Sequence, residues 1–291
     1  MVGVGSATDE GKYVRANGLD IHYRDSGAGA PLLLLHGGSV SSSDVWADHP
    51  YGWGRYLDRF AAHFRVIAPD TRGHGRTVNP GGAMHYRLLA DDVVALIDAL
   101  GLHQPLVFGF SDGGITASLV GMHHPGLLRA IVNFAGYDLI NPDAPIRRAI
   151  RMAHGGSPEA TEANPALIRR WSTVPGALRE MLPKLEADHD AAQGAGHWLT
   201  LFAQTFPMRT LPLDEGFEDF RRVTDPMLIL VGDRDEYCSV AEAVTVYRML
   251  PHGELAILPN LAHGMAQRVV ETALDFLLRH ASRPGKTGHA R

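Results

Sequence analysis

The pattern in this chain that most strongly indicates chemistry is Gly109-Phe110-Ser111-Asp112-Gly113. The apolar run 105–108 precedes it and the helical stretch 115–124 follows it, so the serine lies in a sharp turn between a strand and a helix. Such a turn, a nucleophile elbow, exposes the serine Oγ at the end of a strand, and small flanking residues avoid Cβ clashes. The following helix N-terminus directs backbone N–H groups toward a developing oxyanion. The pattern therefore predicts Ser111 as a nucleophile.

A serine nucleophile requires a base and a group that orients the base. After an elbow serine, an aspartate and then a histidine are expected along the chain. Of the 16 histidines, His263 alone follows the last predicted strand and precedes the last predicted helix. Asp235 follows the predicted strand at 227–231, and His263 follows the one at 255–258. The loops after these two strands can converge on Ser111. Asp235 and His263 are the predicted acid and base.

Two other aspartates remain open as the acid. Asp233 directly follows a strand, where it could instead cap the turn or pair with Arg234. Asp138 follows the earlier strand that ends at Ala135. We favour Asp235 over both of them.

A second glycine-rich turn, His36-Gly37-Gly38, follows another apolar run. The backbone N–H groups of Gly38 and Asp112 are the predicted pair of oxyanion donors. The glycines also turn the chain, and this turn would aim the donors. His36 is predicted to be a structural hydrogen-bonding residue. The segment 70–77 resembles a functional motif, but we interpret it as structural, with Asp70 and Arg72 tying loops together.

Composition and charge exclude several classes of protein. The chain has 291 residues, 45% hydrophobic and 20% charged, as in ordinary soluble globular proteins. The net charge of −5 and the absence of a Lys/Arg cluster argue against a nucleic-acid partner. No signal peptide or apolar run of membrane-spanning length is evident, so no membrane association is expected. The single cysteine, Cys238, fits a cytoplasmic location, and no paired Cys/His spacing predicts a metal.

Short apolar runs alternate with helical patterns along most of the chain. Strands are predicted at 13–16, 21–24, 32–35, 65–68, 105–109, 130–135, 227–231 and 255–258, and helices at 85–100, 115–124, 239–250 and 265–280. Asn17-Gly18 is a favoured pair for a tight hairpin turn between the first two strands. The alternation predicts an α/β fold with a doubly wound, mostly parallel sheet.

The alternation breaks between 136 and 222, a proline-interrupted and helix-like stretch. We interpret it as an inserted helical lid over the carboxyl edge of the sheet, where ligands bind in open α/β sheets. An ordinary helical excursion is the alternative. The predicted organisation is a core in two parts, 1–135 and 223–280, with the insertion 136–222 between them and a disordered tail at 281–291.

Together these residues resemble the α/β-hydrolase superfamily over roughly 12–135 and 223–280. The His-Gly-Gly turn, the Pro-Asp-x-Arg-Gly-x-Gly segment, the elbow, Gly-x-x-Asp and the late histidine occur in the order of that family. The resemblance implies an α/β-hydrolase fold, a Ser-Asp-His triad and no cofactor. Some members of the fold place the acid where Asp138 lies.

The elbow sequence is most similar to that of valacyclovir-hydrolase-like esterases. In those esterases the aspartate after the nucleophile is associated with recognition of a substrate amino group, and Asp112 occupies that position. The alternative for Asp112 is a solvated carboxylate stabilised by the helix dipole. Haloalkane dehalogenases and epoxide hydrolases of this fold carry an aspartate at the elbow, where this chain has Ser111.

The expected function is hydrolysis of a small carboxylic ester, lactone or related acyl compound, with a small molecule as the partner. Carbon–carbon bond hydrolases and cofactor-free perhydrolases of the fold keep the same triad and are the enzymatic alternatives. A non-hydrolytic small-molecule receptor is the alternative from another class. Aromatic side chains of the loop 45–56 and of the insertion are the expected substrate contacts: Trp46, Trp171, Trp198 and Phe202.

Overall fold

The computed structural model describes residues 11–38, 52–141 and 178–282. Eight strands form one sheet in the order β1-β2-β4-β3-β5-β6-β7-β8. They are β1 Lys12–Ala16, β2 Leu19–Ser26, β3 Pro31–Leu35, β4 Arg65–Pro69, β5 Leu106–Phe110, β6 Ala130–Phe134, β7 Met227–Gly232 and β8 Gly253–Leu258. β2 pairs antiparallel with β1 and β4, and every later pairing in the sheet is parallel. The predicted α/β-hydrolase fold with a mostly parallel sheet is confirmed.

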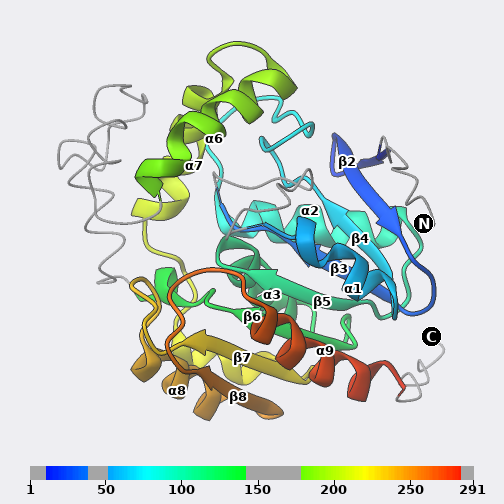
Figure 1. Cartoon of the computed structure of the whole chain (residues 1–291), viewed down its shortest axis with the longest axis vertical. Helices are drawn as coiled ribbons and strands as arrows, with labels where there is room; N and C mark the ends of the chain where they lie inside the picture. Colours follow the sequence, from blue (N-terminus) through cyan, green and yellow to red (C-terminus); the bar gives the residue numbers. More distant parts are fainter. Residues whose placement is uncertain (1–10, 39–51, 142–177, 283–291) are drawn as a thin grey trace, which may run out of the picture.

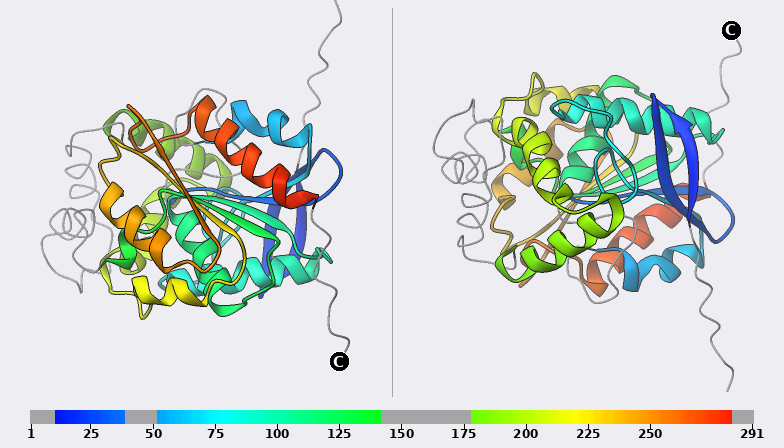
Figure 2. Two further views of the ribbon diagram at one scale, coloured as in Figure 1. Left: turned by 90° about the horizontal axis from the view of Figure 1, so that it is seen from below. Right: turned by 90° about the horizontal axis from the view of Figure 1, so that it is seen from above.

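The helices cover both faces of this sheet, as Figure 1 shows. They are α1 Leu57–Ala61, α2 Tyr86–Ala99, α3 Asp112–His123, α6 Leu178–Gln193, α7 His197–Thr210, α8 Val240–Met249 and α9 Gln267–Ala281, with 3-10 turns at Gly54–Tyr56, Asp138–Ile140 and Phe217–Arg222. The two views of Figure 2 place α1 and α9 on one face and α2 and α3 on the other. The short helix α1 and the 3-10 turns were not predicted, because pieces this short leave little periodicity in a sequence.

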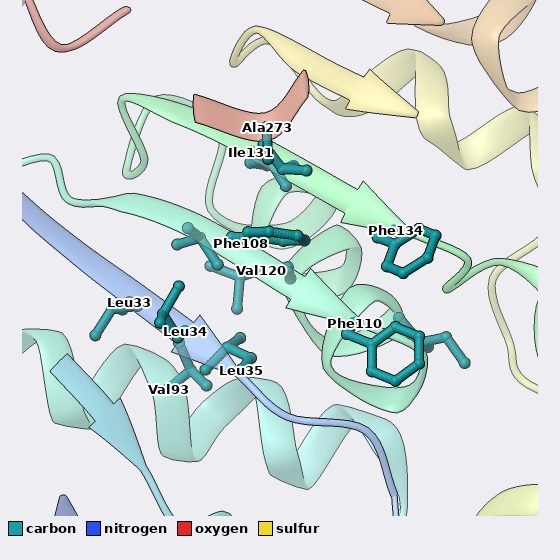
Figure 3. Close-up of a cluster of buried hydrophobic side chains, with 14 of the residues drawn as sticks. Leu33, Leu34, Leu35, Val93, Phe108, Phe110, Val120, Ile131, Phe134 and Ala273 are labelled. Carbon is teal, nitrogen blue, oxygen red and sulfur yellow. The ribbon is translucent and has the colours of Figure 1, made fainter. Parts of the chain in front are cut away.

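The central strands are apolar on both sides because helices cover both faces. The leucines of β3 are fully buried, and the five residues of β5 are buried as well. Figure 3 shows Phe108 and Phe110 of β5 beside Phe134 of β6, with Val93 of α2 and Ala273 of α9 in the same cluster. This core fixes the carboxyl ends of β3, β5 and β6 relative to one another.

The long excursion between β6 and β7 carries α6 and α7, which we call the inserted helices. They contact each other and lie together at one end of the molecule (Figure 1). The described parts of the predicted insertion are 136–141 and 178–222, and its remaining residues, like the predicted tail from 283 on, lie outside the described residues. Within the described residues, no helix combines the length and the apolar character needed to cross a membrane.

Candidate active site

Ser111 lies between the last residue of β5 and the first residue of α3, with φ 53° and ψ −120°. Few residues other than glycine adopt this region, and such strain persists only where the surroundings fix it. Here the Ser111 N–H donates to the Phe134 carbonyl at 2.9 Å, and the Ser111 carbonyl accepts from Gly114 N–H at 2.8 Å. The backbone of the predicted nucleophile is therefore held from both sides.

The glycines of the elbow are required by close approach of backbone. A Cβ on Gly109 would collide with the carbonyl of Gly113, and a Cβ on Gly113 would collide with the carbonyl of Leu35 in β3. Neither backbone atom can move without displacing a strand or a helix. The glycine spacing thus lets β5, α3 and β3 meet at Ser111.

Asp235 and His263 come together at the ends of β7 and β8. The His263 Nδ1–H donates to Asp235 Oδ2 at 2.9 Å, and both side chains are buried. Asp235 Oδ1 accepts the backbone N–H groups of Tyr237 and Cys238 at 2.9 and 2.8 Å. This arrangement fixes the rotamer of the carboxylate and the tautomer of the imidazole, which directs Nε2 away from Asp235.

The His263 imidazole lies beside the elbow. Its ring centroid is 5.0 Å from that of Phe110, the residue before Ser111, and Tyr237 packs edge-on at 4.9 Å. Burial opposes the charge on the ring, but the carboxylate of Asp235 and its hydrogen bond raise the pKa of His263 above the ordinary value. The site thus holds an imidazole that accepts a proton readily.

The other two candidate acids have different surroundings. Asp233 accepts the backbone N–H of Leu261 at 3.3 Å and so ties the two loops together. The pKa of Asp138 is raised to about 7, chiefly by burial and also by the nearby carboxylates of Asp112 and Asp235. The charge of His263 lowers this pKa but does not offset the increase. Asp138 therefore lies close enough to the imidazole to interact with its charge, whereas Asp235 holds the ring by a hydrogen bond.

The turn after β3 brings Gly38 against the elbow. A Cβ on Gly38 would overlap the Asp112 carboxylate and the Arg209 guanidinium, so a larger residue there would have to displace these two side chains. His36 donates from Nδ1 to the Gly37 carbonyl at 2.6 Å and accepts the Thr71 N–H at Nε2, at 3.0 Å. Burial lowers the pKa of His36, which keeps the ring neutral for both contacts. His36 shapes the turn that carries Gly38.

The Asp112 side chain is not a solvated carboxylate, and this alternative is wrong. Tyr86 of α2 donates its hydroxyl to Asp112 Oδ1 at 2.9 Å, and Arg209 of α7 donates from Nη2 to Oδ2 at 2.7 Å. Asp112 is 8% exposed. The carboxylate that the resemblance associates with a substrate amine thus already holds an internal cation. Arg209 and Tyr86 were missed, since no local pattern marks residues that meet only in three dimensions.

The segment after β4 has the structural contacts that its sequence suggested. Asp70 Oδ2 accepts from His22 Nδ1 and from the Arg76 N–H, each at 2.9 Å. Arg72 donates two hydrogen bonds to the carboxylate of Asp92 in α2, at 2.8 and 2.6 Å. Both contacts tie this segment to neighbouring elements.

Two of the four predicted substrate contacts lie in the described residues. Trp198 and Phe202 of α7 are 2% and 4% exposed, and their rings pack edge-to-face with centroids 6.0 Å apart. Both belong to the hydrophobic core cluster, and contact with a substrate stays a prediction. Trp46 and Trp171 lie outside the described residues. Among the described residues, no three His, Cys, Asp or Glu side chains are placed to hold a metal ion.

Comparison with known proteins gives one consistent result. A family profile described as "alpha/beta hydrolase fold" matches residues 30–229. A 2-hydroxymuconate semialdehyde hydrolase of a Pseudomonas species is 25% identical over 92% of this chain and 93% of its own. A 3-oxoadipate enol-lactonase of Acinetobacter baylyi is 26% identical over 71% of this chain and 74% of its own. A non-heme haloperoxidase of Rhodococcus erythropolis is 28% identical over 90% of this chain and 96% of its own.

Solved structures agree on the fold. A thermophilic esterase from Thermogutta terrifontis superimposes with a TM-score of 0.70, at 20% identity over 94% of this chain and 98% of its own. At 20% identity this structural similarity supports the fold alone.

Proposed function

Since the chain belongs to the α/β hydrolase fold family, we propose that it is a serine hydrolase that cleaves a small carboxylic ester, lactone or related acyl compound through an acyl-enzyme. One observation carries this proposal. The imidazole of His263, held by Asp235 at 2.9 Å, packs against Phe110, the last residue of β5 and the residue before Ser111. This arrangement supports Ser111, His263 and Asp235 as the proposed nucleophile, base and acid.

In the proposed reaction Ser111 Oγ attacks the substrate carbonyl carbon while His263 Nε2 takes the hydroxyl proton. Asp235 stabilises the resulting imidazolium and keeps its orientation. The N–H groups of Gly38 and Asp112 donate hydrogen bonds to the carbonyl oxygen and stabilise the negative charge that develops on it. The imidazolium then protonates the leaving alcohol, and the acyl-enzyme remains on Ser111. Water activated by His263 releases the acid and restores the serine. These steps require no cofactor and no metal.

Carbon–carbon bond hydrolysis is the second candidate. It is favoured by the match to a 2-hydroxymuconate semialdehyde hydrolase over nearly the whole of both chains. The likeness to a haloperoxidase similarly favours a perhydrolase side activity on the same triad. Multiple turnovers on a short p-nitrophenyl ester support the esterase and contradict the non-hydrolytic receptor. A vinylogous 1,5-diketone hydrolysed faster than that ester would favour carbon–carbon cleavage.

The nucleophile is tested by Ser111→Ala. We expect kcat on any ester substrate to fall at least about a thousandfold while the unfolding midpoint stays close to wild type, because the covalent step is lost. A fluorophosphonate probe should label Ser111 in the wild type. Ser239 is an exposed serine that caps α8, and the control variant Ser239→Ala should be labelled at Ser111 to the same extent as the wild type. Labelling at another residue, or near-normal turnover by Ser111→Ala, would disprove the assignment.

We further propose a small molecule as the partner, with neither nucleic acid nor membrane involved. A cytoplasmic location stays a prediction from the single cysteine.

A further inference from the structure

A buried ion pair lies at the N-terminus of the nucleophile helix. Arg209 near the end of α7 donates to Asp112 at 2.7 Å, and the two side chains are 10% and 11% exposed. Tyr86 of α2 donates to the second carboxylate oxygen at 2.9 Å. Three elements that are distant along the chain, α2, α3 and α7, therefore meet at the carboxylate of the residue after Ser111.

The surroundings favour the charged form of Arg209 and the neutral form of Tyr86. Burial opposes the charge on Arg209, but the Asp112 carboxylate raises the pKa of Arg209 above its ordinary value. Burial and the charge of Asp112 raise the pKa of Tyr86 well above its ordinary value, so its hydroxyl remains a donor. A buried ion pair is a poor source of stability, because desolvation offsets much of the attraction. Its position relative to the oxyanion donors points to another role.

Both proposed oxyanion donors are in contact with the ion pair. Asp112 supplies one N–H and carries the carboxylate. Gly38 supplies the other N–H, and a Cβ added to Gly38 would overlap both Asp112 Oδ2 and Arg209 Nη2. The pair therefore fills the space beside the Gly38 Cα. The position of the guanidinium limits where the turn after β3 and the start of α3 can lie.

Three other hydrogen bonds join the inserted helices to the segment that follows β4. Gln193 and His197 donate to the carbonyls of Gly75 and Gly73, at 2.8 and 2.9 Å, and the Gln204 carbonyl accepts the Met84 N–H at 2.8 Å. These contacts attach α6 and α7 to the segment 73–84. Arg209 instead reaches the elbow itself.

We propose that Arg209 is a positioning residue of the oxyanion hole. It acts through Asp112 to hold the Gly38 and Asp112 N–H groups at the spacing that the transition state requires, and it makes the seating of α7 a condition for turnover. Because its effect is on the charge that develops in the transition state, its loss should lower kcat more than it raises KM. This inference rests on the proposed acyl-enzyme mechanism.

The test compares three variants on one neutral p-nitrophenyl ester. Arg209→Met removes the cation at similar length, and we expect kcat to fall about ten- to a hundredfold, somewhat less than the loss of a whole oxyanion donor, with KM within about threefold of wild type. Arg209→Lys should recover part of kcat, because the charge returns without the planar fork. The rate of fluorophosphonate labelling should fall in parallel with kcat.

Asp112→Asn keeps the backbone N–H and removes the carboxylate, so it should lower kcat by a similar factor. The double variant Asp112→Asn/Arg209→Met should be no slower than the worse single variant, since either change breaks the same contact. If the two effects multiply instead, Arg209 does not act through Asp112 and the proposal is wrong.

The matched control is Arg72→Met, which breaks the buried Arg72–Asp92 ion pair at 2.6 Å. It should lower the unfolding midpoint and leave kcat of the folded enzyme near wild type. An equal loss of kcat in Arg72→Met and Arg209→Met would show a purely structural effect and overturn the proposal, as would a change confined to KM. Failure of wild type itself to be labelled at Ser111 would instead reject the proposed function.

Should Arg209→Met fail to fold, Arg209→Lys and Asp112→Asn still decide the question. A wild-type kcat in both of these variants would overturn the proposal.

Discussion

At the scale of single residues, two carboxylates near the same imidazole differ in what surrounds them. Asp235 accepts two backbone N–H groups in addition to the His263 ring. Asp138 is buried beside the Cys238 thiol, and its pKa is raised by burial to about 7. Burial and the charges of Asp138 and Asp235 also raise the pKa of Cys238 well above its ordinary value, so the thiol remains protonated and is a poor nucleophile.

The two carboxylates are separated by amide substitutions. Asp235→Asn should lower kcat about a thousandfold or more, because the imidazole takes the wrong tautomer and its cation loses support. Asp138→Asn should keep kcat within about tenfold of wild type, and Asp233→Asn, which alters only a loop contact, serves as the control. Steady-state kinetics on one ester measure all three variants. A crippled Asp138→Asn with an active Asp235→Asn would move the acid to the end of β6.

At the scale of elements, the elbow depends on how closely three backbones approach. Gly113 of α3 lies against the carbonyl of Leu35 in β3, a backbone atom fixed within the sheet. Gly121, two turns further along the same helix, faces instead the end of the Ile131 side chain, 2.9 Å from the position of an added Cβ. A side-chain end can shift, whereas a strand carbonyl cannot do so without a change in the sheet.

This difference predicts unequal costs for the same substitution. Gly113→Ala should lower the free energy of unfolding by about 1–3 kcal/mol or more and also lower kcat, since Ser111 is displaced. Gly121→Ala should cost less, because the gain in helix propensity of up to about 1 kcal/mol offsets part of the crowding. Urea denaturation and ester turnover measure the two effects. Equal costs at both positions would contradict a special contact at the elbow.

At the scale of the whole molecule, a row of four histidine rings extends from the turn after β3, which carries Gly38, to the inserted helices. Ring centroids are 5.0 Å apart for His36 and His74, 5.9 Å for His74 and His189, and 6.4 Å for His189 and His197. Burial lowers the pKa of His36, although Asp70 and Asp112 act in the opposite direction. Burial, with the charges of His36, His189 and Arg209, lowers the pKa of His74 well below 6.5.

These depressed pKa values predict loss of stability in acid. Below pH 6.5 the unfolded chain protonates histidines that the folded protein keeps neutral. Stability is therefore full above that pH and should fall by up to about 1.4 kcal/mol per pH unit for each such histidine as the pH decreases. Asp138 acts in the opposite direction, since its raised pKa makes the folded protein bind a proton between pH 3.8 and about 7.

The variant His74→Gln isolates one histidine of the row. Urea denaturation between pH 7.5 and 5 gives the dependence of the unfolding free energy on pH. In His74→Gln this free energy should fall less steeply with decreasing pH than in the wild type, by the equivalent of up to about one bound proton. His103→Gln, at an exposed position, is the matched control and should leave the slope unchanged. An unchanged slope in His74→Gln would show that His74 does not contribute to the acid sensitivity.

The sequence by itself determined the fold class and the candidate nucleophile. Both depend on local patterns: strands and helices follow from periodicity, and the elbow follows from glycines two residues either side of Ser111. Order along the chain selected His263 from 16 histidines as the candidate base. Short helices such as α1 were not predicted, because five residues carry almost no periodic signal.

Only the tertiary structure decided which charges meet. Arg209, which pairs with the Asp112 carboxylate, lies 97 positions away in the insertion, outside the residues on which the resemblance rested. The sequence alone therefore left only the amine-binding and the solvated alternatives for Asp112. Sequence predicted Asp235 as the partner of His263 but left Asp233 and Asp138 open, and the hydrogen bond to Asp235 and the raised pKa of Asp138 appear only once the separate loops are packed together. Local spacing determines which helices and strands form. The electrostatic environment of a buried group instead depends on the burial, charges and hydrogen bonds contributed by every element packed around it, and these contributions exist only after folding.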